Sequence, residues 1–196
     1  MLVVFIRKGR TGTQPEKGQV MPDIKNMQPS ENCFQVTRWA EGLELKAYPD
    51  PASGGAPWTI GRGHTKGVKP GMTCTPQQAD QWLREDLADA AAKVKQHVTG
   101  SLTQGQFDCL CDMAFNLGTG FIAKDGVVGD FDDLVRNRDI AGVRKHIPDF
   151  RLASGKVMPG LVKRGGARVA LWDGDDYATA MRKGEEALLK YKAGKS

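Results

Sequence analysis

Helix signals follow one another from residue 75 almost to the C-terminus, and they constrain the fold more than any other feature. Thr75-Pro76-Gln77-Gln78 has an N-cap threonine, a proline at the first helical position and a glutamine three residues after the cap. Thr103-Gln104-Gly105-Gln106 repeats the capping pattern, and apolar residues then recur at helical spacing up to Phe115. Further helices are expected near 130–137, 139–146, 160–172 and 175–192.

The chain before residue 75 has a different character. Ser30 can cap a helix that ends at Gly42, with an acidic residue in its first turn. Turn residues then separate two short β-prone runs at 45–48 and 58–60. These signals predict an α+β fold with a lysozyme-like division, a small irregular β-hairpin lobe beside a larger helical lobe.

The 196 residues suit one domain with short appendages. Residues 1–29 are rich in glycine and proline, so we expect a weakly ordered tail before a domain at 30–174. Residues 175–196 form a basic helix with an apolar face. Such a helix can lie on an anionic membrane, but packing on its own domain is the commoner arrangement and the one we favour.

Composition narrows the class of protein. The net charge of +5 favours polyanionic partners. Nothing in the sequence resembles a nucleic-acid recognition element, so we expect no nucleic-acid partner. The four cysteines contain no Cys-x-x-Cys and the three histidines are scattered, so we expect no metal or cofactor. No apolar run approaches the ~20 residues of a membrane span. The apolar run 1–6 precedes the basic residues Arg7, Lys8 and Arg10, the reverse of a signal peptide, so we expect no export by that route.

Two carboxyl groups suggest a division of labour between acid and base. Glu41 lies at the expected C-terminal end of a helix, where the negative end of the helix dipole favours its protonated form. Asp50 lies between two prolines in a polar turn, where it should stay ionised. Catalytic acid–base pairs need such contrasting environments, although carboxylates at these positions are more often plain surface charges.

The wider pattern resembles the phage-type lysozymes, glycoside hydrolase family 24. Glu41, Asp50 and Thr59 in Thr59-Ile-Gly61-Arg-Gly63-His64 are similar to the catalytic signature of that family. Phe115-Asn116-Leu-Gly-x-Gly is similar to its cleft-lining segment, and Gly160-Leu-Val-Lys-Arg164 to its late helix. The resemblance covers about residues 33–174 and implies an active-site cleft between the two lobes.

The resemblance also implies roles for residues. Glu41 would be the general acid that cleaves the bond between N-acetylmuramic acid and N-acetylglucosamine in peptidoglycan. Asp50 would stabilise positive charge on the sugar ring or help to activate water, and Thr59 would hold the attacking water. The substrate-binding residues would be Phe115, Asn116 and Arg164, and the structural residues near the site His64, Gly61 and Gly63. The family pattern favours an inverting reaction. It further implies a monomeric endolysin that stays in the host cytoplasm until a separate holin-like protein opens the membrane to the periplasmic wall.

Some choices stay open at this point. Arg164 matches an arginine that pairs with the catalytic glutamate in some relatives, but a surface ion pair is an equal alternative. A lytic transglycosylase, which needs a glutamate but no positioned water, is a rival within the same chemistry. A wall-binding or nucleic-acid-binding module is a rival from another class.

The sequence departs from the family pattern at two places. Eight residues separate Asp50 from Thr59 where the shorter family pattern has five, so 51–57 should form a longer loop. The late helix has Gly165 and Arg168 where many relatives have arginine and glutamate. Because glycine weakens a helix by about 1 kcal/mol relative to alanine, we expect looser packing there.

Overall fold

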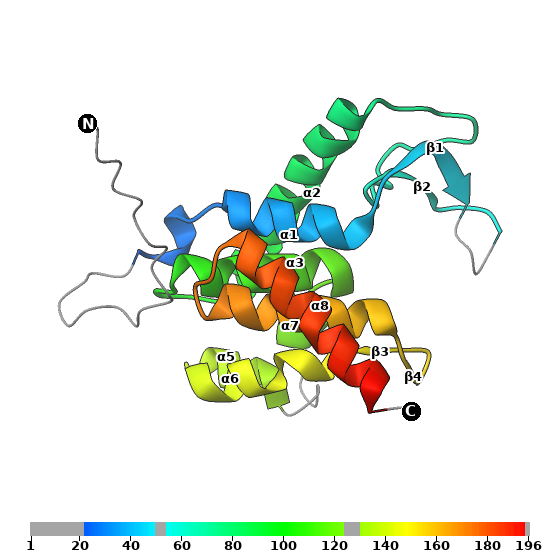
Figure 1. The fold of residues 1–196 in the computed structure, drawn as a ribbon. Coiled ribbons are helices and arrows are strands. Elements are labelled where there is room, and N and C mark those ends of the chain that lie inside the picture. Colours follow the sequence, from blue (N-terminus) through cyan, green and yellow to red (C-terminus); the bar gives the residue numbers. More distant parts are fainter. Residues whose placement is uncertain (1–21, 50–53, 124–129, 195–196) are drawn as a thin grey trace, which may run out of the picture.

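The structure, a computed structural model, describes residues 22–49, 54–123 and 130–194 (Figure 1). Helix α1 (Glu31–Glu41) begins after Ser30, whose hydroxyl accepts a hydrogen bond from the amide of Asn32 at 3.1 Å. It ends at Gly42, which has a φ of +70° that favours glycine. Helices α2 (Pro76–His97) and α3 (Gln104–Leu117) both begin with the predicted capping boxes.

A small β-hairpin forms one end of the molecule. Strands β1 (Glu44–Pro49) and β2 (Trp58–Gly61) pair antiparallel, with Tyr48 opposite Thr59 and an irregularity in register between Glu44 and Tyr48. In Figure 1 this hairpin lies beside α2, far from α5 and α6. It is therefore a lobe at one edge of the helical body, next to the C-terminal end of α1.

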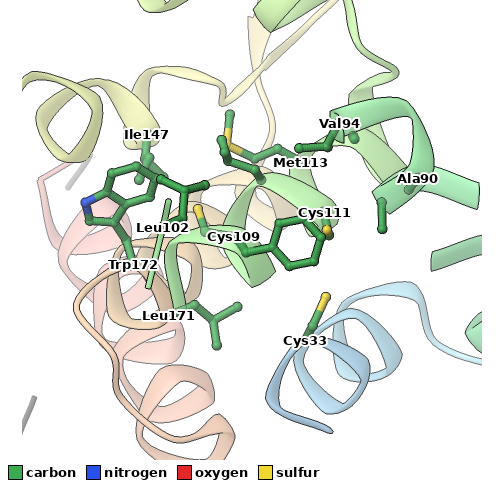
Figure 2. Close-up of a cluster of buried hydrophobic side chains, with 14 of the residues drawn as sticks. Cys33, Ala90, Val94, Leu102, Cys109, Cys111, Met113, Ile147, Leu171 and Trp172 are labelled. Atoms are coloured by element: carbon green, nitrogen blue, oxygen red, sulfur yellow. The ribbon is translucent and has the colours of Figure 1, made fainter. Parts of the chain in front are cut away.

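The remaining elements build the helical lobe around α3. They are η1 (Ile24–Asn26), α4 (Gly120–Ala123), α5 (Phe131–Arg136), α6 (Ile140–His146), η3 (Ile147–Asp149), β3 (Leu152–Ala153), β4 (Lys156–Val157), α7 (Pro159–Trp172) and α8 (Tyr177–Ala193). Helix α7 packs on α3, and α8 packs along α7 and against α1. Figure 2 shows part of the core, a cluster of buried side chains that includes Cys33, Cys109, Met113, Leu171 and Trp172. Burial of this apolar surface is the main term that stabilises the fold.

The α+β, lysozyme-like architecture predicted from the sequence is confirmed. The N-terminal boundary is different. Residues 22–29 were expected in the weakly ordered tail, but Ile24 and Met27 are buried, and the Ile24 amide donates to the Gly100 carbonyl at 2.9 Å. Residues 1–21 lie outside the described part. The hairpin β3–β4, η1 and α4 were not predicted.

The expectation of looser packing concerned Gly165, where a Cβ atom would lie at an ordinary contact distance of 3.5 Å from the Cα of Pro148, but the neighbouring contact between α7 and α8 is close. A Cβ atom on Gly166 would lie 2.7 Å from the Cβ of Ala187, and one on Gly184 would lie 2.6 Å from the carbonyl oxygen of Lys163. Glycine is needed here because α7 and α8 approach too closely for any side chain. Within the described ranges no helix has the length and apolar character required to cross a membrane.

Candidate active site

The C-terminal end of α1 carries Glu41 and is held by an arginine from the β lobe. Arg62 donates from Nη1 to the carbonyl oxygens of Gly42 (2.6 Å) and Arg38 (3.2 Å), and from Nε to Asp80 in α2 (2.6 Å). These bonds satisfy carbonyls that a helix end leaves without partners, and the cation offsets the negative end of the dipole. Arg62 thus fixes the β lobe to the helix end that presents Glu41.

Arg164 of α7 lies beside Glu41 in the interior. Its Nη1 forms an ion pair with Oε1 of Glu41, and the Arg164 side chain is only 5% exposed against 21% for Glu41. The alternative of a surface ion pair is therefore excluded. The other edge of the guanidinium donates twice to Asp112 of α3, from Nη2 at 2.7 Å and from Nε at 3.0 Å.

Asp112 is fully buried and has a second arginine partner, Arg168, whose Nε donates to it at 2.6 Å. Burial raises the pKa of Asp112, but the two guanidinium groups outweigh this and hold the pKa well below its usual range. The same ion pairs raise the pKa of Arg164 against its own burial. Glu41, Arg164, Asp112 and Arg168 therefore form one row of alternating charge.

Glu41 opens on a cleft of about 420 Å³. Gly63, Phe115 and Asn116 line it together with Glu41. A Cβ atom on Gly63 would lie 3.5 Å from Oε2 of Glu41 and 3.7 Å from the Phe115 ring. The farther wall is charged in both signs, by the residues Lys66, Asp86, Asp89 and Lys93. Such a polar cleft suits a hydrophilic ligand.

Thr59 lies on β2 opposite Tyr48, and the two side chains are hydrogen-bonded. Burial raises the pKa of Tyr48, and the carboxylates of Glu44 and Glu41 add to the increase. Tyr48 is a neighbour of the site that the sequence reasoning missed. Its position opposite Thr59 on the neighbouring strand of the hairpin is the signal that could have found it. Asp50, and with it residues 51–53 of the expected longer loop, lies outside the described residues.

The three residues expected to be structural near the site have distinct contacts. His64 stacks on Trp82 at 4.9 Å, and its ring nitrogens contact Asp86 (2.8 Å) and the Lys66 carbonyl (3.0 Å). Gly61 (φ +69°) lies where a Cβ would be 3.0 Å from Ala79 of α2. None of these contacts directs His64 at Glu41, and Gly61 and Gly63 allow close approach to α2 and to the carboxyl.

Among the described residues, no cluster of three or more histidine, cysteine or acidic side chains is arranged to hold a metal ion. The buried thiols of Cys33, Cys109 and Cys111 are free, and burial raises their pKa. The cleft presents the Glu41 carboxyl with the buried Arg164 behind it, and Thr59 is not among the residues that line it.

Comparison with known proteins gives a family. The phage lysozyme family model matches residues 37–168. An endolysin of Acyrthosiphon pisum secondary endosymbiont phage 1 is 34% identical over 153 residues, which cover 74% of this chain and 97% of the relative. An endolysin of Lactococcus phage c2 is 36% identical over 148 residues, 75% of this chain but only 61% of that longer relative.

Two solved structures share the fold. The muramidase domain of SpmX from Asticaccaulis excentricus has a TM-score of 0.65 at 26% identity, covering 74% of this chain and 97% of that one. An endolysin from Escherichia coli O157:H7 phage FAHEc1 has a TM-score of 0.63 at 28% identity, covering 75% and 94%. The chain therefore belongs to the phage lysozyme family and is a lysozyme-type glycoside hydrolase.

Proposed function

We propose that the enzyme hydrolyses the β-1,4 bond between N-acetylmuramic acid and N-acetylglucosamine in bacterial peptidoglycan, with Glu41 as general acid. The placement of the two Glu41 oxygens carries this proposal. Oε1 is held by the buried Arg164, whereas Oε2 faces the cleft beside Gly63, where no side chain intervenes. One carboxyl oxygen is thus fixed and the other is presented to a ligand, which is the geometry that a proton donor needs.

In this mechanism the proton on Oε2 passes to the glycosidic oxygen as the bond from that oxygen to the sugar C1 breaks. The electron pair of the bond stays with the leaving oxygen, and positive charge develops on the ring. Arg164 stabilises the carboxylate that proton donation leaves on Glu41.

Water completes the reaction. We propose that the hydroxyl of Thr59, oriented by its hydrogen bond with Tyr48, holds a water for attack on C1, and that Asp50 stabilises the cationic ring and accepts the proton that this water loses. Attack from the face opposite the leaving group inverts the anomeric centre and requires carboxyl groups roughly 6.5–9.5 Å apart. Proton NMR of the first product tests this: the α-anomer supports inversion and the β-anomer contradicts it.

Phe115 and Asn116 are proposed as substrate-binding residues because both line the cleft beside Glu41. Phe115 offers an apolar ring face to a sugar, and Asn116 offers an amide. The Oδ1 of Asn116 accepts from Arg168 at 3.0 Å, which fixes the orientation of that amide.

Replacing Glu41 by glutamine tests the proposal. Glu41→Gln keeps the shape of the side chain but has no proton to give, so we expect it to bind cell walls yet no longer clear a wall suspension. Glu44→Gln is the matched control, since Glu44 is an exposed glutamate three residues away at the start of β1. Clearing by Glu41→Gln at the wild-type rate, with the fold checked by circular dichroism, would refute the assignment.

The products separate hydrolysis from the rival chemistry. Hydrolysis leaves a free reducing end on each cut, whereas a lytic transglycosylase leaves a 1,6-anhydro ring. Mass spectrometry of digested walls distinguishes the two by the mass of one water. A pure binding module, the rival from another class, would release no fragments at all.

We also propose that the enzyme acts as a monomer, binds no nucleic acid, and reaches the wall from the host cytoplasm through a holin-like partner. Expression alone should then leave cells intact until the inner membrane is permeabilised, and lysis without permeabilisation would contradict the scheme. Helix α8 packs through Ala180 and Gly184 against its own domain, which supports a role in the fold over one on an anionic membrane.

A further inference from the structure

We propose that Asp112 is a positioning residue for Glu41 and acts through Arg164, an inference that rests on the proposed role of Glu41 as the acid. The Asp112 carboxylate lies directly behind Arg164 in the core, in the middle of α3. The family resemblance assigned no role to this position. The contacts of Asp112 show what its carboxylate does to the arginine that holds Glu41.

Asp112 fixes the plane of the Arg164 guanidinium. A guanidinium is a flat, rigid fork, so two bonds on one edge determine where its remaining nitrogen points. Asp112 accepts from Nη2 of Arg164 at 2.7 Å and from Nε at 3.0 Å, and the remaining Nη1 is the atom on Glu41. The direction in which Arg164 presents its Nη1 to the acid is therefore determined by Asp112.

The carboxylate of Asp112 is in turn immobile. Besides the two bonds from Arg164, its Oδ2 accepts from Nε of Arg168 at 2.6 Å, and its Oδ1 lies 2.8 Å from the hydroxyl of Thr37, which shares its single proton between Asp112 and the Cys33 carbonyl oxygen at 2.9 Å. These four donors use the full accepting capacity of a carboxylate. Thr37 lies on α1 one helical turn before Glu41, so Asp112 is tied to the same helix that presents the acid.

The charge of Asp112 matters as much as its position. A buried guanidinium beside Glu41 stabilises the anionic form of the acid, and the negative charge of Asp112 offsets that effect. Arg168 supplies the cation that lets Asp112 remain ionised while fully buried. This explains the departure of Arg168 from the family pattern: it is the counter-ion of Asp112 and also donates to the Asp112 carbonyl at 3.3 Å.

The other charged groups that face Glu41 lie across the cleft or above it. They are Lys66 after β2, the residues Asp86, Asp89 and Lys93 on α2, and the phenol of Tyr48 on β1. All are present in every variant proposed below. A change in the pH profile on altering Asp112 therefore reports the buried row of charges.

Asp112→Asn tests the proposal by removing the charge with little change in shape. We expect kcat for soluble wall fragments to fall about tenfold or more while KM changes less than about twofold, because the acid is misaligned but the cleft is intact. The alkaline limb of the pH–kcat profile should move to lower pH, because loss of the Asp112 charge leaves the Arg164 guanidinium uncompensated beside the acid. The double variant Asp112→Asn/Arg168→Gln removes one charge of each sign. Its alkaline limb should lie between those of Asp112→Asn and the wild type.

Asp132→Asn is the matched control. Asp132 is likewise a fully buried aspartate, paired with Arg136 at 2.5 Å, but it lies on α5 at the end of the molecule away from the β lobe (Figure 1). Its loss should lower the Tm without moving the pH profile. An equal pH shift in Asp132→Asn, or wild-type kcat and pH profile in Asp112→Asn, would overturn the proposal.

Two further variants keep these results interpretable. If Asp112→Asn does not fold, Thr37→Val tests the proposal instead. This variant removes one hydrogen bond to the Asp112 carboxylate without changing the charge. The value of kcat should therefore fall about threefold, and the pH profile should stay in place. An unchanged kcat in Thr37→Val would then overturn the proposal. Clearing by Glu41→Gln would refute the proposed function itself, whereas inactive Glu41→Gln together with normal Asp112→Asn would refute only the role of Asp112.

Discussion

The contact between the start of α3 and the end of α7 gives the most demanding test of the packing. A Cβ atom on Gly105, the second residue of α3, would meet the carbonyl oxygen of Leu171 well inside van der Waals contact and would lie 3.2 Å from the Cα of Gly174. Both obstacles are backbone atoms, and the Leu171 carbonyl also accepts a hydrogen bond from the Gly174 amide at 2.9 Å. Gly105→Ala must therefore move α3 away from α7.

The expected cost follows from three effects. Overpacking of this kind costs about 1–3 kcal/mol. Loosening the bond to Leu171 adds about 1 kcal/mol, and the better helix propensity of alanine returns at most about 1 kcal/mol. The free energy of unfolding should thus fall by about 1–3 kcal/mol, and a loss of 2 kcal/mol in a chain of this size lowers the Tm by about 4–8 °C.

Gly160→Ala is the matched control for this substitution. Gly160 is also the second residue of a helix, α7, but a Cβ there would have no neighbour within 4 Å. Urea unfolding followed by circular dichroism should show Gly105→Ala destabilised and Gly160→Ala at or above wild type. Stabilities of the two variants within about 0.5 kcal/mol of each other would refute the packing argument.

Three other outcomes are expected. Thr59→Val should lower kcat far more than Thr59→Ser, because only serine retains a hydroxyl to hold water; equal rates from the two variants would count against that role. Although burial raises the pKa of Asp80, the guanidinium groups of Arg62 and Arg38 hold it below its ordinary value of about 3.9. The ionised Asp80 then stabilises the fold above that pH, and this stabilisation is lost as the pH falls. In urea unfolding between pH 5 and 3, the free energy of unfolding should therefore decrease less in Asp80→Asn than in the wild type. An equal decrease in the two proteins would contradict this. Wild-type protein should release no dye from anionic liposomes, because α8 is packed on its own domain. Leakage caused by the wild type and abolished when Lys190 and Lys192 are neutralised would contradict this.

Much of the fold could be predicted because its signals are local. The capping threonines before α2 and α3 and the turn residues after α1 each act within one helical turn. The burial of Ile24 could not be predicted, since its partner Gly100 lies far along the chain and nothing near Ile24 indicates it. The close approach at Gly166 and Gly184 was missed for the same reason, and glycine was interpreted only as a weak helix former.

In the site, too, residues that belong to local motifs could be identified from the sequence and residues that depend on distant contacts could not. Glu41 and Arg164 were identified through motifs; in the structure Glu41 lines the cleft and Arg164 forms an ion pair with it from the buried side. Asp112 was not found, because in a single helix it is merely a polar residue in an apolar stretch. A usable signal did exist in the pair, since Asp112 and Arg168 are opposite charges at core-facing positions of two different helices, 56 residues apart.

The order of the chain has a consequence for when the enzyme can become active. Glu41 is made early, but its ion-pair partner Arg164 is synthesised 123 residues later. The back of α1 is then covered by α8, with the Tyr177 amide bonded to Asn32 at 3.0 Å and Gly184 against Trp39. A nascent chain emerging from the ribosome therefore holds an unaligned acid until α7 and α8 have been translated, so products that end before α7 should be harmless to the cell that makes them.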